Sequence, residues 1–394
     1  MPVTANRDRI FYFAAVSTAM LSTGKVLNFL VMAFYLAVWM LTVPWHLIKV
    51  RILYTYEHKP GFCQRSHFSE YTGMLLARWM FSLEQTTAGR ILFGRTAWMW
   101  FYKFRRFRSG AIDMGDVRFE NDPIIPGLWV RSEGRVPNYD IVLFWMHGGG
   151  MVTHSPYMYL EFMTALVTSL HMQGFRSPAI FMLKHSYAPE HPFPHQLDEA
   201  AIAWNYLQKE HPAANFVFAG DGSGANLALA LLLHITRPCV GVTECVRDVK
   251  PKSALLLSPW PNWKTSTRED TENCYFSASH LRRYRNYYIP RAKETSPYFD
   301  LSGVTSLSWW RESFPERGMY LIYGTEEMFA NEIEELYGIL RLCGPIKIDG
   351  ELRQIHCWPI TTHFLARDEY VRGAGVFAIA LNLGKMLIWG NDVR

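Results

Sequence analysis

Residues 216–227 join an apolar run to a helical segment through a short series of small residues, Gly-Asp-Gly-Ser-Gly-Ala. A strand, a sharp turn and a helix joined in this way form a nucleophile elbow. The elbow needs small residues before and after the nucleophile because strand and helix approach closely around a strained turn. A nucleophile position at Gly222 puts Gly220 and Gly224 at the small positions, whereas position 223 would put Asp221 there. The pattern therefore predicts an acyl-transfer site with glycine at the nucleophile position.

Three further groups that acyl transfer needs are present in the chain. The apolar run 141–146 is followed by His147-Gly148-Gly149-Gly150, whose flexible backbone can aim N–H groups at an oxyanion. A second apolar run, 319–324, is followed by Glu327, and His363 comes later in the chain. The order nucleophile, acid, histidine is that of α/β-hydrolases, so we predict that Glu327 orients His363 as general base.

Several motifs agree with this order. They are HGGG at 147–150, YAPEHPFP at 187–194, SPW at 258–260 and GTEEMFANE at 324–332. From about residue 120 to its C-terminus the chain resembles the hormone-sensitive-lipase group of α/β-hydrolase-fold carboxylesterases, in particular membrane-anchored, fungal steryl-acetyl-hydrolase-like proteins. The usual elbow of that group, G-D-S-A-G-G-N, aligns with residues 220–226 except at the serine, its neighbour and the second small position.

The resemblance implies a role for each predicted site residue. Gly148 and Gly149 would donate oxyanion-hole N–H groups, with the backbone N–H of Ser223 as a third donor. His363 would act as general base and acid, oriented by Glu327 where most relatives carry aspartate. The resemblance also implies an α/β-hydrolase fold, with a mostly parallel central sheet flanked by helices.

Glycine at 222 has no side chain that can attack a carbonyl, and three interpretations stay open. The natural site binds or transforms something without an acyl-enzyme, the chain is an inactivated form of a serine esterase, or Ser223 swings into the site. The resemblance favours action on a lipophilic ester, such as an acetylated sterol or another secondary metabolite. The alternative is a pseudo-hydrolase that binds a hydrophobic ligand, or a non-hydrolytic enzyme of cyclase or lyase type that uses His363 and the oxyanion hole.

The remaining sequence predicts the elements that position these groups. With 394 residues, of which 49% are hydrophobic and 15% aromatic, the chain can bury one large α/β core and an appendage. Apolar runs alternate with helical patterns, which is typical of a mostly parallel sheet. We expect strands near 139–147, 177–184, 214–219, 252–258 and 319–324, and helices near 195–210, 224–236 and 328–342.

The N-terminal region has a different composition. Between Lys25 and Lys49 lie 23 residues without a formal charge, long enough as a helix to cross a hydrocarbon core of about 30 Å. We predict a tail at 1–25, a single transmembrane anchor at 26–48, a basic and aromatic linker or cap at 49–115, and the α/β-hydrolase domain at 116–394. A buried core helix is the alternative for the anchor. The resemblance to anchored esterases indicates the endoplasmic reticulum membrane.

Between Arg90 and Arg108 cations alternate with aromatic residues. This mixture suits a helix at an anionic membrane surface, and a cap helix over the site explains it equally well. Nucleic acid is not expected as a partner, because no recognition motif is present and the net charge is only +5.

We predict neither a metal site nor a cofactor. His154, His185, His191 and His195 lack the paired helical spacing of a zinc site, and no phosphate-binding glycine loop is visible. Glu190, within YAPEHPFP, resembles the family residue that braces the oxyanion loop. The expected partners are a lipophilic small molecule and membrane lipid.

Overall fold

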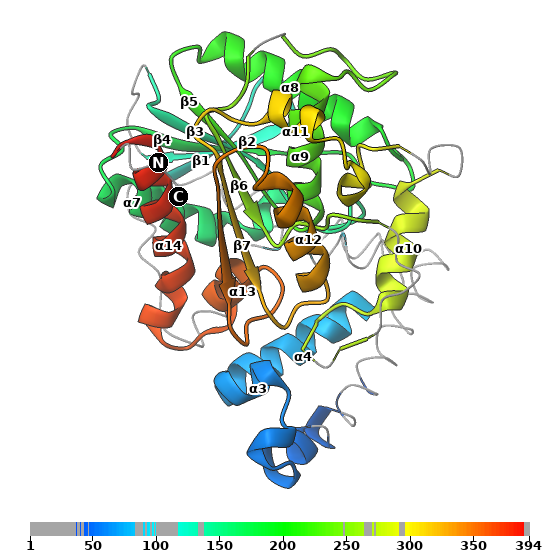
Figure 1. Cartoon of the computed structure of the whole chain (residues 1–394). Helices are drawn as coiled ribbons and strands as arrows, with labels where there is room; N and C mark the ends of the chain where they lie inside the picture. Colours follow the sequence, from blue (N-terminus) through cyan, green and yellow to red (C-terminus); the bar gives the residue numbers. More distant parts are fainter. Residues whose placement is uncertain are drawn as a thin grey trace, which may run out of the picture.

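An eight-stranded sheet forms the centre of the computed structural model (Figure 1). Its strands are β1 (Val117–Asn121), β2 (Gly127–Ser132), β3 (Ile141–Met146), β4 (Pro178–Leu183), β5 (Asn215–Asp221), β6 (Ser253–Leu257), β7 (Met319–Gly324) and β8 (Ile346–Glu351). Their order across the sheet is β1-β2-β4-β3-β5-β6-β7-β8. Only the pairs β1 with β2 and β2 with β4 are antiparallel, so the expectation of a mostly parallel sheet is confirmed.

The structure describes residues 37, 40, 43–45, 47–82, 90, 93, 94, 97, 99, 117–132, 138–246, 249–263, 270, 271, 273–290 and 296–389. The α-helices are α3 (Gly61–Arg65), α4 (Phe68–Ser82), α7 (Leu160–Met172), α8 (His195–Glu210), α9 (Ser223–Thr236), α10 (Ala278–Tyr288), α11 (Leu307–Ser313), α12 (Ala330–Leu340), α13 (Trp358–Leu365) and α14 (Glu369–Leu387). Short helical turns occur at Lys49–Leu53, Tyr56–His58, Pro156–Met158 and Leu301–Gly303.

The sheet separates two hydrophobic cores because successive side chains of a strand point to opposite faces. In β3, Val142 and Phe144 pack toward α8, α9 and α12, whereas Leu143 and Trp145 pack toward α7, α13 and α14. All six residues of β3 are buried. This is why the central strands appear in the sequence as continuous apolar runs.

The five strands expected from such runs, and the three expected helices, are present with ends shifted by a few residues. Three strands were not expected. The edge strands β1 and β8 are only partly buried and carry charged residues, so neither forms an apolar run. The missed β8 affects the assignment of the site, because His356 lies in the short segment that joins β8 to α13.

Helices α3 and α4 lie at one end of the molecule, next to α13 (Figure 1). Their buried face, which includes Tyr71 and Met74, forms a third cluster with Tyr275 and Ile355 of the sheet domain. The predicted anchor at 26–48 falls largely outside the described residues. Within the described ranges, no helix combines the length and the apolar character that a membrane span requires. Of the basic and aromatic segment 90–108, only five positions are described.

Candidate active site

Gly222 forms the whole turn between β5 and α9, since the strand ends at Asp221 and the helix begins at Ser223. Its backbone has φ 53° and ψ −116°, a conformation that residues with a side chain rarely adopt. The N–H of Gly222 donates to the carbonyl of Leu257 at 2.9 Å, and its own carbonyl accepts from the N–H of Trp260 at 3.0 Å. The loop that carries the SPW motif therefore holds the turn from both sides.

The neighbours of this turn must be small. A Cβ on Gly220 would lie 2.6 Å from the carbonyl of Gly224, and a Cβ on Gly224 would lie 2.0 Å from the carbonyl oxygen of Met146. Both distances are far below van der Waals contact. The close approach of β5, α9 and β3 therefore gives the geometry of a nucleophile elbow centred on position 222.

His356 is the histidine that faces this elbow. Its Nδ1 lies 2.6 Å from Oε2 of Glu327, and a Cβ built on Gly222 would lie 3.1 Å from its Nε2. Both side chains are buried, at 4% and 0% exposed. Burial raises the pKa of the Glu327 carboxyl, while the contacts with His356 and with the hydroxyl of Ser258 lower it. Glu327 can therefore hold the imidazole with Nδ1 protonated and Nε2 directed at the elbow.

The predicted pairing of His363 with Glu327 is wrong. His363 lies in α13, and its Nε2 is 3.2 Å from Oε1 of Glu161 in α7. Its Nδ1 is 3.4 Å from the carbonyl oxygen of Arg372. The side chain thus packs in the core on the α7 and α14 face. The sequence contained a usable signal, because His356 is the first histidine after β8 and precedes the helix, whereas His363 falls inside it.

The glycine loop after β3 is tied to a buried carboxylate, Asp221. The Gly148 N–H donates to this carboxylate, as do the hydroxyl of Tyr159 at 2.9 Å and Nε1 of Trp145 at 3.1 Å. Burial raises the pKa of Asp221 to about 6, against these hydrogen bonds, which lower it. The N–H of Gly148 thus faces Asp221 in this structure, and its role as an oxyanion donor stays a prediction.

Gly149 and Gly150 carry the loop past the elbow, with φ values of 103° and 63°. The Gly150 N–H, which sequence reasoning did not single out, donates to Oγ of Ser223 at 2.9 Å. Ser223 is also the first residue of α9, and a helix leaves the N–H groups of its first turn without intrahelical acceptors. The donors gathered at the elbow are thus those of Gly150 and Ser223, with Gly149 adjacent in the loop.

Aromatic rings surround His356. The ring centroids of Phe276, Phe329 and Tyr275 lie 5.0, 5.2 and 5.9 Å from that of its imidazole. Phe81, from α4, stacks on Tyr275 at 5.4 Å, so the N-terminal region contributes to this wall. A substrate group next to His356 would therefore meet an apolar surface.

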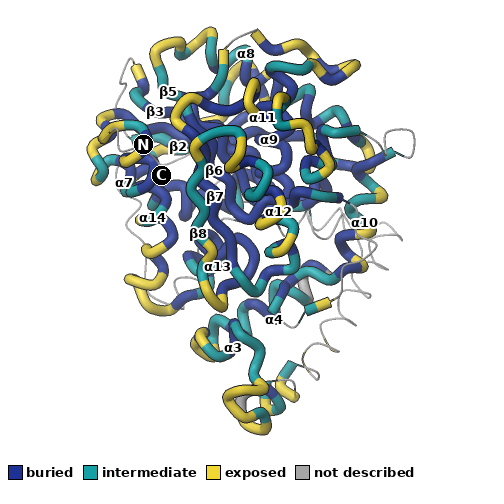
Figure 2. The backbone as a smooth tube through the Cα atoms, in the orientation of Figure 1, coloured by how far each residue is buried: buried dark blue, intermediate teal, exposed yellow. Residues whose placement is uncertain are grey.

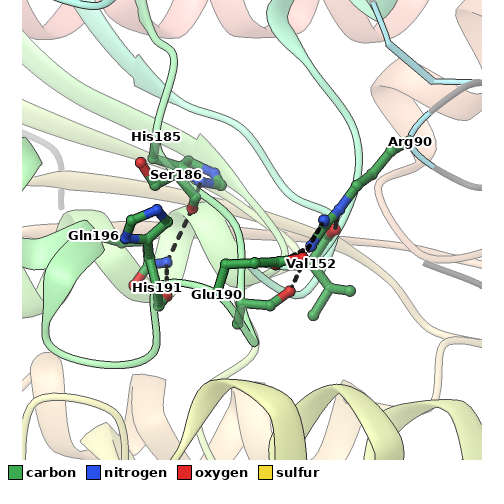
Figure 3. Close-up of polar contacts among 8 residues, drawn as sticks. Arg90, Val152, His185, Ser186, Glu190, His191 and Gln196 are labelled. Carbon is green, nitrogen blue, oxygen red and sulfur yellow. Dashed lines mark hydrogen bonds and ion pairs between the residues drawn. The ribbon is translucent and has the colours of Figure 1, made fainter. Parts of the chain in front are cut away.

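The predicted brace, Glu190, accepts two hydrogen bonds from Arg90, at 2.9 and 2.8 Å (Figure 3). The same guanidinium reaches the carbonyl of Val152, in the glycine loop, at 3.0 Å. Glu190 therefore acts on the loop through an arginine of the N-terminal region that sequence reasoning had assigned to a membrane surface or a cap. Within the described part of the chain, no three histidine, cysteine or acidic side chains cluster in a way that would hold a metal ion.

Residues 143–359, more than half of the chain, match the family described as the alpha/beta hydrolase fold. The chain belongs to the α/β-hydrolase fold family. The solved structure of an esterase from the bacterial hormone-sensitive lipase family superposes with a TM-score of 0.63. It is 17% identical and the match covers 82% of this chain and 99% of that one, so the α/β-hydrolase fold expected from the sequence is confirmed.

Two named relatives of this α/β-hydrolase are acetyl hydrolases. Steryl acetyl hydrolase 1 of Saccharomyces cerevisiae is 23% identical over 218 residues, which are 52% of this chain and 50% of the yeast protein. An acetyl-hydrolase of Streptomyces hygroscopicus is 25% identical over 278 residues, covering 64% of this chain and 81% of that protein. The chain thus matches only about half the length of the yeast relative.

Proposed function

We propose that this chain hydrolyses an ester of a lipophilic alcohol, such as an acetylated sterol or another acetylated secondary metabolite. The observation that carries the proposal is the alignment of Glu327, His356 and the turn at Gly222, with Nε2 of His356 3.1 Å from the Cβ position of residue 222. A carboxylate that orients a histidine toward an elbow is an arrangement suited to acyl transfer. The names of the two acetyl-hydrolase relatives support an acetyl ester as substrate.

Because Gly222 has no nucleophilic side chain, we propose that water attacks directly. A water held in van der Waals contact with Gly222, on the side to which a Cβ would point, faces Nε2 of His356 and is placed to donate a hydrogen bond to it. His356 takes a proton from this water as its oxygen bonds to the acetyl carbon, and Glu327 stabilises the imidazolium. The N–H of Ser223 stabilises the oxyanion, together with the N–H of Gly150 once the hydroxyl of Ser223 has turned away from it. The ester C–O bond then breaks, and the departing alkoxide takes the proton from His356, which leaves acetic acid and the alcohol.

The aromatic wall supports a lipophilic substrate. Phe276, Phe329 and Tyr275 enclose the imidazole of His356, which is itself 3% exposed. Desolvating a polar alcohol portion against these rings would be unfavourable, whereas a flat apolar ring system would gain contact area.

The test is hydrolysis of aryl and steryl acetates by the purified chain and three single variants. We expect His356→Gln to lower the rate to that of the uncatalysed reaction. Gly222→Ala should do the same, because the added methyl group would displace a water held between Gly222 and Nε2 of His356. His363→Gln is the matched control and should retain the rate, since that histidine packs on Glu161. Equal rates in the parent chain and His356→Gln would contradict the proposal.

A ligand-binding pseudo-hydrolase is the second candidate. The hydroxyl of Ser223 takes the Gly150 N–H that an oxyanion would need, and Gly222 supplies no nucleophile. Tight binding of a steryl acetate, with no acetate released after prolonged incubation of either the parent chain or Ser223→Ala, would favour this candidate. The site would then act only through its shape and its apolar contacts.

We also propose that the chain is attached by a single span to a membrane, at the endoplasmic reticulum. Large apolar residues in the described part of the N-terminal region are exposed, at 63% for Trp45, 73% for Ile52 and 61% for Leu53. Figure 2 shows the part of the tube next to α3 largely in the colour of exposed residues. Trp45 lies within the uncharged stretch between Lys25 and Lys49, and Ile52 and Leu53 follow shortly after it. Exposed aromatic and aliphatic residues next to a long apolar stretch suit the interface of a bilayer.

Carbonate extraction of membranes tests the attachment. The full chain should stay in the membrane pellet, because apolar residues near the middle of a span each favour insertion by roughly 0.3 to 0.6 kcal/mol. A chain that begins near residue 50 should be released. Release of the full chain by carbonate would refute a membrane span.

A further inference from the structure

The glycine loop after β3 has a backbone that local sequence does not favour. Four of its residues have positive φ, and two of these, Met151 at 58° and His154 at 71°, carry a Cβ that disfavours the left-handed region. A loop in this conformation must be held by contacts from outside itself. Because Gly149 and Gly150 belong to the same loop, whatever holds it also sets where their N–H groups point.

The guanidinium of Arg90, which lies outside the loop, contacts both the loop and the segment 187–190. Arg90 donates from Nε to the carbonyl of Val152 at 3.0 Å and from Nη2 to the carbonyl of Ala188 at 2.7 Å. Its two Nη atoms also reach the two carboxylate oxygens of Glu190 (Figure 3). The guanidinium lies over the ring of Tyr187, 4.9 Å from its centroid. A planar fork of donors can satisfy this set of acceptors together, which a lysine cannot do.

The groups that Arg90 contacts are connected to the donors of the loop. The N–H of Val152 donates to the carbonyl of Gly149 at 3.1 Å, and the N–H of Ala188 donates to the carbonyl of Met151 at 2.8 Å. The hydroxyl of Tyr187 donates to the carbonyl of His154. Arg90 therefore connects the loop, at Val152, to the segment 187–190, at Ala188.

The ion pair alone does not account for this role. The Glu190 side chain is 56% exposed, and exposed ion pairs contribute little to stability. The hydrogen bonds from Arg90 hold the pKa of Glu190 down to about 2, so the carboxylate stays charged at all ordinary pH values. The two carbonyl contacts are directional. One is to Val152 of the loop and the other to Ala188, whose N–H bonds to Met151 of the loop, so together they fix the loop's position.

We propose that Arg90 is a positioning residue for the oxyanion loop, so that a residue of the N-terminal region completes the geometry of the site. Arg90 acts through Val152 and Ala188 on the N–H groups of Gly149 and Gly150 and touches no reacting atom. The assignment of these N–H groups to an oxyanion rests on the proposed function, whereas the fastening of the loop does not.

Hydrogen–deuterium exchange of the full chain tests the fastening. Arg90→Met should raise the amide exchange rate of peptides covering 147–155 by about tenfold or more, because the hydrogen bond to Val152 and the link through Ala188 are both lost. It should leave β5 unchanged. Arg90→Lys, which keeps the charge and can hold one acceptor, should give a smaller rise. Arg237→Met is the matched control, because Arg237 also pairs with a glutamate, Glu312 at 2.7 Å, and lies over Trp309 at 5.0 Å.

Kinetics separate positioning from simple attachment. Where the parent chain turns over an aryl acetate, Arg90→Met should lower kcat by up to about 100-fold with little change in KM, as expected for misplaced donors. Arg90→Lys should recover part of kcat. Unchanged loop exchange in both Arg90 variants would overturn the proposal, as would a loss confined to KM. If the Arg90 variants show faster loop exchange but the parent chain shows no turnover, only the proposed function would be refuted.

Discussion

Replacing Gly222 with serine is the most informative single perturbation of this site. The elbow already has φ 53° and ψ −116°, so serine should enter the existing turn instead of reshaping it. We expect a stability cost of about 1 to 3 kcal/mol for a side chain in this conformation. The new Cβ would be 3.1 Å from Nε2 of His356, so the imidazole must move away by a few tenths of an ångström. After this shift the imidazole is still within reach of the serine hydroxyl.

The expected gain in activity is large. Removing the nucleophile of a serine protease lowers kcat by about a million-fold, and the oxyanion hole and binding keep only a small part of the acceleration. Gly222→Ser should therefore raise the hydrolysis of short aryl esters by several orders of magnitude, up to about that factor. A burst of aryl alcohol and fluorophosphonate labelling at residue 222 are the measurements.

Gly222→Ala is the matched control, because alanine carries the same Cβ and the same backbone strain without a hydroxyl. It should show the same stability cost and no labelling. His356→Gln in the serine variant should remove the burst. The reasoning fails if the probe labels Ser223, or if a folded Gly222→Ser protein shows no burst that depends on His356.

Three further predictions concern the surroundings of the elbow. Because burial raises the pKa of Asp221 from its ordinary 3.8 to about 6, the folded state binds the extra proton between these values, and the free energy of unfolding should fall by about 3 kcal/mol as pH rises through that window. Denaturant unfolding at several pH values should show that Asp221→Asn removes this part of the fall. Gly224→Ala should cost about 3 kcal/mol or more in thermal unfolding, because its Cβ would be 2.0 Å from the carbonyl of Met146, whereas Gly338→Ala, with nothing within 4 Å, should be neutral or slightly stabilising. In the serine variant, Glu327→Gln should lower kcat by about ten-thousand-fold without a matching rise in KM, since an amide does not hold the imidazole in the required tautomer.

The central strands could be predicted from the sequence because helices cover both faces of the sheet. A strand such as β3, with all six residues buried, must be apolar throughout, and this pattern is visible without a structure. The elbow was equally accessible, because close packing of β5 and α9 restricts Gly220 and Gly224 to small residues. Both features depend on contacts between neighbouring elements of the chain.

His356 and the contacts of Arg90 with the glycine loop could not be predicted in the same way. β8 is an edge strand with partly exposed residues, so its end could not be located, and His363 was chosen over His356 although only His356 reaches Glu327. Arg90 bonds to Glu190 across 100 positions of the chain. The composition of the segment between Arg90 and Arg108 suggested a membrane surface or a cap. No local pattern indicates the partner of a single arginine.

The position of α3 and α4 has a consequence for how the chain folds during synthesis. Arg65 pairs with Glu351 at 2.6 Å, 286 positions later, and Tyr71 is buried in a cluster with Ile355. At about 5 to 20 residues per second, translation separates these partners by roughly 15 to 60 s. For most of that interval the apolar face of α4 lacks Tyr275 and Ile355, its partners in the sheet domain. We therefore expect that a truncation before β8, which removes Ile355, leaves this face partly uncovered and aggregation-prone even where the elbow itself has formed.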